Sequence, residues 1–136
     1  MKRALLVLFA GGLVWGACLF VGTSAGGFKP ARSPYGVEAE IRIDGRRAPR
    51  FSGELLEVRD STLLVLRDAR VTEVPISAIR AARFPQNIVI DRGRISDGDR
   101  EKLRLLSRYP GGLPAESVAQ LLAAYGQTAP DSVVQP

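Results

Sequence analysis

Residues 37–66 decide the fold, and they run VEAEIRIDGRRAPRFSGELLEVRDSTLLVL. Apolar and polar residues alternate over 37–43, which is the pattern of a β-strand with one buried face. Asp44 and Gly45 then form a turn signal, because glycine accepts the positive φ that tight hairpin turns need. The stretch therefore predicts a β-hairpin at its start.

The two strands that follow differ in their patterns. Residues 51–59 begin in one apolar phase and change to the other near Leu55, which predicts a bulge or sharp bend that Gly53 eases. Residues 62–66 form a nearly continuous apolar run, typical of a strand buried on both faces. Such a strand needs cover on each side of the sheet.

Three further segments extend the β region. Residues 71–76 predict a fourth strand, where Pro75 favours an edge because proline cannot donate to a ladder. Residues 79–84 predict a fifth strand, and residues 87–91 offer a short sixth. Five short strands at this spacing predict a small five-stranded β-barrel over residues 36–92.

Helical periodicity replaces the β pattern after residue 95. Ser96, followed three residues later by Asp99, predicts a capped helix start, and Pro110 ends that helix. Pro114 starts a second helix, at the position where a missing N–H costs nothing. Its apolar residues recur at i, i+3, i+4 and i+7, and they are Val118, Leu121, Leu122 and Tyr125.

We expect these helices to form a hairpin over residues 96–126 that packs on the barrel, since short helices rarely hold alone. The domain is then mainly β, and α+β overall. Residues 127–136 are expected to be a disordered tail. In the alternative interpretation, the apolar stripe of the second helix is the docking face for a partner protein.

The first 25 residues have the order of a secretory signal. Lys2 and Arg3 are basic, residues 4–21 carry no charge, and Thr23 and Ala25 supply the small side chains that a signal peptidase requires. Cleavage is expected after Ala25.

Two other interpretations of this segment stay open. The apolar run is nearly long enough to remain as a membrane anchor. The sequence WGAC at 15–18 resembles a bacterial lipobox, which would attach lipid at Cys18. Residues 26–35 are rich in Gly, Pro and Ser and predict a flexible linker. In each case the folded part lies outside the cytoplasm.

The β region resembles the first motif of Sm-like and SH3-type small β-barrels. The stretches that carry the resemblance are IRIDGR at 41–46, GEL at 53–55 and VRDSTLLVL at 58–66. It covers residues 37–84 and implies a small barrel and, in Sm-like proteins, RNA contact and assembly into rings. The second motif of that family departs here, since IRA stands at 79–81 where Ile-Arg-Gly is usual.

The chain is poor in catalytic groups. It has no histidine, which removes the commonest general base and metal ligand, and Cys18 is its only cysteine. We therefore predict no enzyme activity, no metal and no cofactor. Arg46, Arg47 and Arg50 flank Phe51, a pattern that could contact an anion or nucleic acid.

The expected function is that of a non-catalytic exported binding or scaffold module, in the envelope or secreted, whose partner is a protein or envelope component. The protein is then expected to contact the membrane only through its N-terminal segment. One alternative is an Sm-like RNA-binding protein, which export disfavours. The other is a membrane-anchored or lipid-linked assembly factor.

Overall fold

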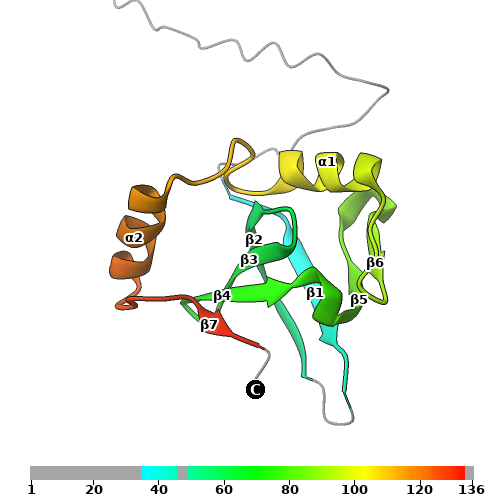
Figure 1. The fold of residues 1–136 in the computed structure, drawn as a ribbon, viewed down its shortest axis with the longest axis horizontal. Helices are drawn as coiled ribbons and strands as arrows, with labels where there is room; N and C mark the ends of the chain where they lie inside the picture. The colour runs from blue at the N-terminus through cyan, green and yellow to red at the C-terminus, as the bar shows by residue number, and fades with distance from the viewer. Residues whose placement is uncertain (1–34, 46–48, 134–136) are drawn as a thin grey trace, which may run out of the picture.

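The computed structural model describes residues 35–45 and 49–133, and all six predicted strands and both predicted helices are present in it (Figure 1). The elements are β1 (Glu38–Ile43), β2 (Arg50–Val58), β3 (Thr62–Arg67), β4 (Arg70–Pro75), η1 (Ile76–Ala78), β5 (Ile79–Arg83), η2 (Pro85–Asn87), β6 (Val89–Asp91), α1 (Asp97–Leu106), α2 (Ala115–Ala124) and β7 (Asp131–Ser132).

The strands form one open sheet in the order β6-β5-β1-β2-β3-β4-β7. The predicted five-stranded barrel over residues 36–92 is therefore wrong, although the mainly β, α+β class is confirmed. Closing a barrel would require β4 to pair with β5. Instead β6 pairs antiparallel with the free edge of β5, and β7 pairs parallel with β4 at Thr72 and Glu73. These added strands take the backbone groups that closure would use.

The bend predicted in the second strand is confirmed. The register between β2 and β3 shifts between Leu55 and Glu57, which marks a bulge or irregularity there. Gly53 lies beside it at a point of very close approach. A Cβ at this position would lie 2.5 Å from Val65 Cγ1 and 2.6 Å from the Leu66 carbonyl oxygen. Only glycine lets β2 and β3 meet this closely.

Burial of the third strand on both faces is also confirmed. Leu63 and Val65 belong to the larger apolar cluster, whereas Leu64 belongs to a second cluster with Leu56 and Val71. Because neighbouring side chains of a strand point to opposite faces, the two clusters lie on opposite sides of β3. At β3, both faces of the sheet are thus covered by apolar side chains.

The two helices supply these two covers separately. Leu103 and Leu106 of α1 join the larger cluster, and Leu122 of α2 joins the second. Figure 1 shows the helices well apart, joined by a long connection. The expected hairpin over residues 96–126, packed on a barrel, is therefore not formed. Each helix covers a different face of the sheet.

The chain after α2 is ordered by one side chain. Gln127 is buried, its Oε1 accepts from the Val71 N–H at 2.7 Å, and its Nε2 donates to the Val71 carbonyl at 3.0 Å. The amide thus occupies the free edge of β4 as a backbone partner would, and β7 continues the pairing. The expectation of a disordered tail over residues 127–136 is wrong up to residue 133, and residues 134–136 lie outside the described residues.

Replacing Gln127 by alanine should destabilise the fold by about 2–4 kcal/mol, because the N–H and C=O of Val71 would both lose their buried partner. Gln120→Ala is the matched control, since Gln120 is exposed on α2. Urea denaturation measures both variants. Equal midpoints for the two would show that the Gln127 contact contributes nothing.

Candidate binding sites

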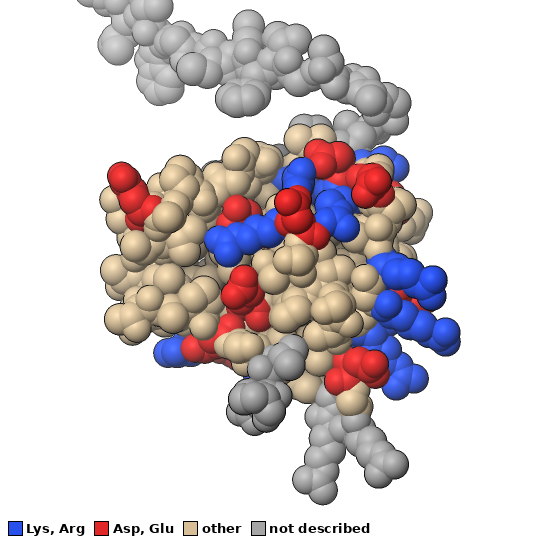
Figure 2. All heavy atoms as spheres, viewed as in Figure 1, with Lys and Arg blue, Asp and Glu red and all other residues tan. Residues whose placement is uncertain are grey.

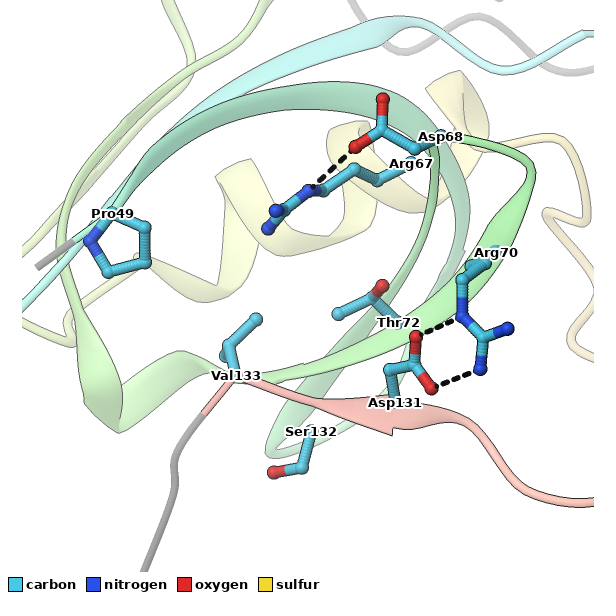
Figure 3. Close-up of a pocket in the computed structure, with 8 residues that line it drawn as sticks. All are labelled: Pro49, Arg67, Asp68, Arg70, Thr72, Asp131, Ser132 and Val133. Atoms are coloured by element: carbon cyan, nitrogen blue, oxygen red, sulfur yellow. Dashed lines mark hydrogen bonds and ion pairs between the residues drawn. The ribbon is translucent and has the colours of Figure 1, made fainter.

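A polar pocket of about 430 Å³ opens where the β3–β4 turn meets β7 (Figure 3). It is lined by Pro49, Arg67, Asp68, Arg70, Thr72, Asp131, Ser132 and Val133. The turn itself has two central residues, Asp68 and Ala69, with φ of 49° and 57°. Positive φ at both is the mark of the tight hairpin turns that match strand twist. This turn sets Arg67 and Arg70 directly opposite each other.

Both arginines of the pocket are already engaged. Arg70 donates from two nitrogens to the Asp131 carboxylate at 2.6 and 2.8 Å, which lowers the pKa of Asp131 and raises that of Arg70. Arg67 pairs with Asp68 at 3.3 Å and lies over the Phe51 ring, 4.8 Å from its centre. Figure 3 shows Arg67 extended across the hollow, and Arg70 beside Asp131. The pocket is therefore charge-balanced, and the Arg70–Asp131 pair holds β7 to β4.

Of the three arginines predicted as an anion or nucleic-acid contact in the first hairpin, the structure describes only Arg50. Arg46 and Arg47 lie outside the described residues, as does Cys18. Arg50 is exposed on β2 and pairs with Glu40 at 3.1 Å. The Phe51 ring is 8% exposed and covered by Arg67, so it has no free face on which a base could stack.

The apolar stripe predicted as a partner face packs inside the domain. Leu122 is buried, and Val118, Leu121 and Tyr125 are half-buried against the second cluster on β2, β3 and β4. This is the intramolecular packing that the length of the helices favours.

Two carboxylates in the sheet were not singled out by the sequence pattern. Glu54 accepts from Arg108 at 2.8 Å and from the Gly36 N–H at 2.6 Å, and its pairing raises the pKa of the Arg108 guanidinium. Glu57 is buried, pairs with Arg59 at 3.0 Å and accepts from the Leu113 N–H. Both carboxylates hold loops to β2.

A different group of cations is exposed and forms no ion pair with any residue that the structure describes. Figure 2 shows basic side chains gathered along the side of the molecule where Figure 1 places β5 and β6. We call this group the arginine surface, and it consists of Arg42, Arg80, Arg83, Arg92 and Arg94.

The sheet register brings these five residues together. Arg42 of β1 lies opposite Ala81, next to Arg80 of β5. The turn after β6 is held against β5 by a hydrogen bond from the Arg92 N–H to the Arg80 carbonyl at 2.9 Å. Arg83 lies opposite Val89 of β6. Sequence reasoning missed this surface because the five residues are up to 52 positions apart, from 42 to 94, and only the pairing of three strands unites them.

The arginine surface differs from most other arginines of the domain in its lack of ion pairs with carboxylates among the described residues. Within residues 35–45 and 49–133, none of its five side chains has an ion pair within 4.0 Å. By contrast, carboxylates pair with Arg50, Arg59, Arg67, Arg70, Arg104 and Arg108. Exposed cations that form no ion pair attract anions, because no carboxylate within 4.0 Å cancels their charge.

The residues that the structure describes lack two other kinds of feature, a metal site and a membrane-spanning helix. The described part of the chain holds no group of three His, Cys, Asp or Glu side chains arranged to bind a metal ion. None of the helices within it is both long and apolar enough to cross a bilayer. No protein family, curated protein or solved structure matches this chain.

Proposed function

We propose that this protein is an exported, non-catalytic binding module of the cell envelope. The observation that carries the proposal is the arginine surface, five exposed cations that form no ion pair within residues 35–45 and 49–133. The charged groups of the pocket form ion pairs with each other. They therefore stabilise the fold and leave little charge for binding a ligand. Binding through the arginine surface needs no catalytic group.

Export is supported by the N-terminal order of basic, apolar and small residues. The docking of the chain at Gly36 and Val37 also supports a boundary between linker and domain. Gly36 donates to Glu54, and the Val37 N–H donates to the Leu106 carbonyl at 3.0 Å. The sheet thus begins directly after the linker expected over residues 26–35. This suits a folded domain that a linker separates from the N-terminal signal segment.

A reporter enzyme that is active only outside the cytoplasm tests export. Fused behind residues 1–30 it should be active, and Leu13→Arg in the apolar run should abolish that activity, because a charge at the centre of the run opposes insertion. A full-length soluble product in the cytoplasm would contradict export.

The mass of the mature chain separates the three fates of the segment. A product that starts at Gly26 indicates cleavage, and a full-length product in the membrane indicates an anchor. A heavier product that loses its lipid in Cys18→Ser indicates lipid attachment. The last two results favour a membrane-anchored or lipid-linked assembly factor.

The second candidate is an Sm-like RNA-binding protein. The bent β2 with Gly53 and the order β5-β1-β2-β3-β4 favour the family resemblance over residues 37–84. Ring assembly in that family pairs the fourth strand of one subunit with the fifth of the next. Here β7 lies on β4 and β6 lies on β5, which opposes such rings. Sedimentation of the protein as a ring of several copies, with tight binding of single-stranded RNA, would favour this candidate.

A further inference from the structure

We infer that the arginine surface docks on the anionic phosphate headgroups of a lipid bilayer. Its five guanidinium groups can each donate paired hydrogen bonds to phosphate oxygens. The basic residues lie on outward positions of β1 and β5 and in the turn after β6, which gives a broad surface. A broad cationic surface suits a bilayer, whose charge is spread over a plane.

The composition of the surface fits a membrane interface. Val89 lies opposite Arg83 on the same face and is 47% exposed, so an apolar side chain stands among the cations. Arginine can keep its guanidinium at the headgroups while its alkyl stem follows apolar surface. Glu40 lies opposite Arg83 and is paired with Arg50. The exposed Asp91 lies opposite Ala81, so five arginines outnumber these two carboxylates and positive charge prevails.

The linker lets this surface reach the membrane. Ten extended residues, 26–35, span at most about 35 Å, whereas a domain of this size has a radius of gyration of about 13 Å. In the interpretation that retains the apolar segment as an anchor, the domain can therefore turn its arginine surface to the bilayer. Tethering raises the local concentration of headgroups, so weak contacts suffice. This docking depends on the proposed envelope location, but the vesicle test below does not depend on export in the cell.

Vesicle binding alone would be uninformative, because residues 4–21 of the full chain would themselves enter a bilayer. The test must instead report on the arginines. The full chain is reconstituted into vesicles of phosphatidylcholine, with or without phosphatidylglycerol, and treated with an arginine-selective dicarbonyl reagent. Mass spectrometry then compares the labelling of Arg80 and Arg83 with that of Arg67, which is far from the arginine surface in the sheet order.

The expected result is shielding of Arg80 and Arg83 in anionic vesicles alone, with Arg67 unchanged, and loss of shielding in high salt. Arg83→Glu should weaken docking roughly tenfold and restore labelling of Arg80. Lys102→Glu is the matched control, because it makes the same charge change on α1, and it should leave the shielding intact.

Equal labelling of Arg80 and Arg83 in the two kinds of vesicle would overturn the inference, whatever the reporter fusion shows. Shielding by soluble glycerol phosphate at the same phosphate concentration would overturn it too, since a bilayer would then be unnecessary. Shielding by single-stranded RNA but not by anionic vesicles would assign the surface to nucleic acid instead.

Discussion

Replacing Leu64 by alanine is expected to cost about 2–5 kcal/mol, a large part of the stability of a domain of this size. Leu64 is fully buried in the second cluster, together with Leu56 on β2 and Leu122 on α2. Its removal leaves a cavity that the crowded β2–β3 pair cannot close easily. Thermal or urea unfolding of the variant measures the loss.

Leu105→Ala is the control for that experiment. Leu105 is 49% exposed on α1, so the same substitution there should change the free energy of unfolding by less than about 0.5 kcal/mol. If Leu64→Ala and Leu105→Ala unfold alike, the second cluster is not a core.

Truncation before residue 113 is expected to have a still larger effect. It removes α2, Gln127 and β7 together, which exposes Leu56, Leu64 and Val71 and leaves the edge of β4 unpaired. Exposed apolar surface beside an open strand edge favours aggregation. The shortened chain should lose cooperative unfolding and bind a hydrophobic dye.

The control for the truncation is a chain that lacks only residues 134–136, which should unfold like the full chain. A soluble chain ending at residue 112 that is as stable as the parent would refute the covering role of α2. In that case the apolar stripe of α2 would be available for a partner.

Local signals carried most of the prediction of the fold. The alternation over residues 37–43, the phase change at Leu55 and the apolar run of β3 each depend on neighbouring residues, and all three are present in the structure. The start of α1 was also readable, since the Ser96 hydroxyl accepts from the Asp99 N–H at 3.1 Å. Such signals need no knowledge of the rest of the chain.

Long-range pairing explains what sequence reasoning missed. The contact between Gln127 and Val71 joins residues 56 positions apart, and β7 has only two residues, too few for any periodicity. The arginine surface has the same origin, because nothing local distinguishes an arginine that pairs, such as Arg70, from one that does not, such as Arg83. Ion pairing depends on tertiary register, which composition and spacing do not specify.

The pairing of Gln127 and β7 with the edge of β4 also affects the protein while it is being synthesised. The ribosome produces β4 well before Gln127 and β7, so for about 50 residues of synthesis the backbone edge at Val71 has no partner. An open edge beside buried apolar positions is a template for pairing with another chain. The sheet can be completed only when Gln127 and β7 have emerged, so the edge of β4 is closed well after β4 itself has been made.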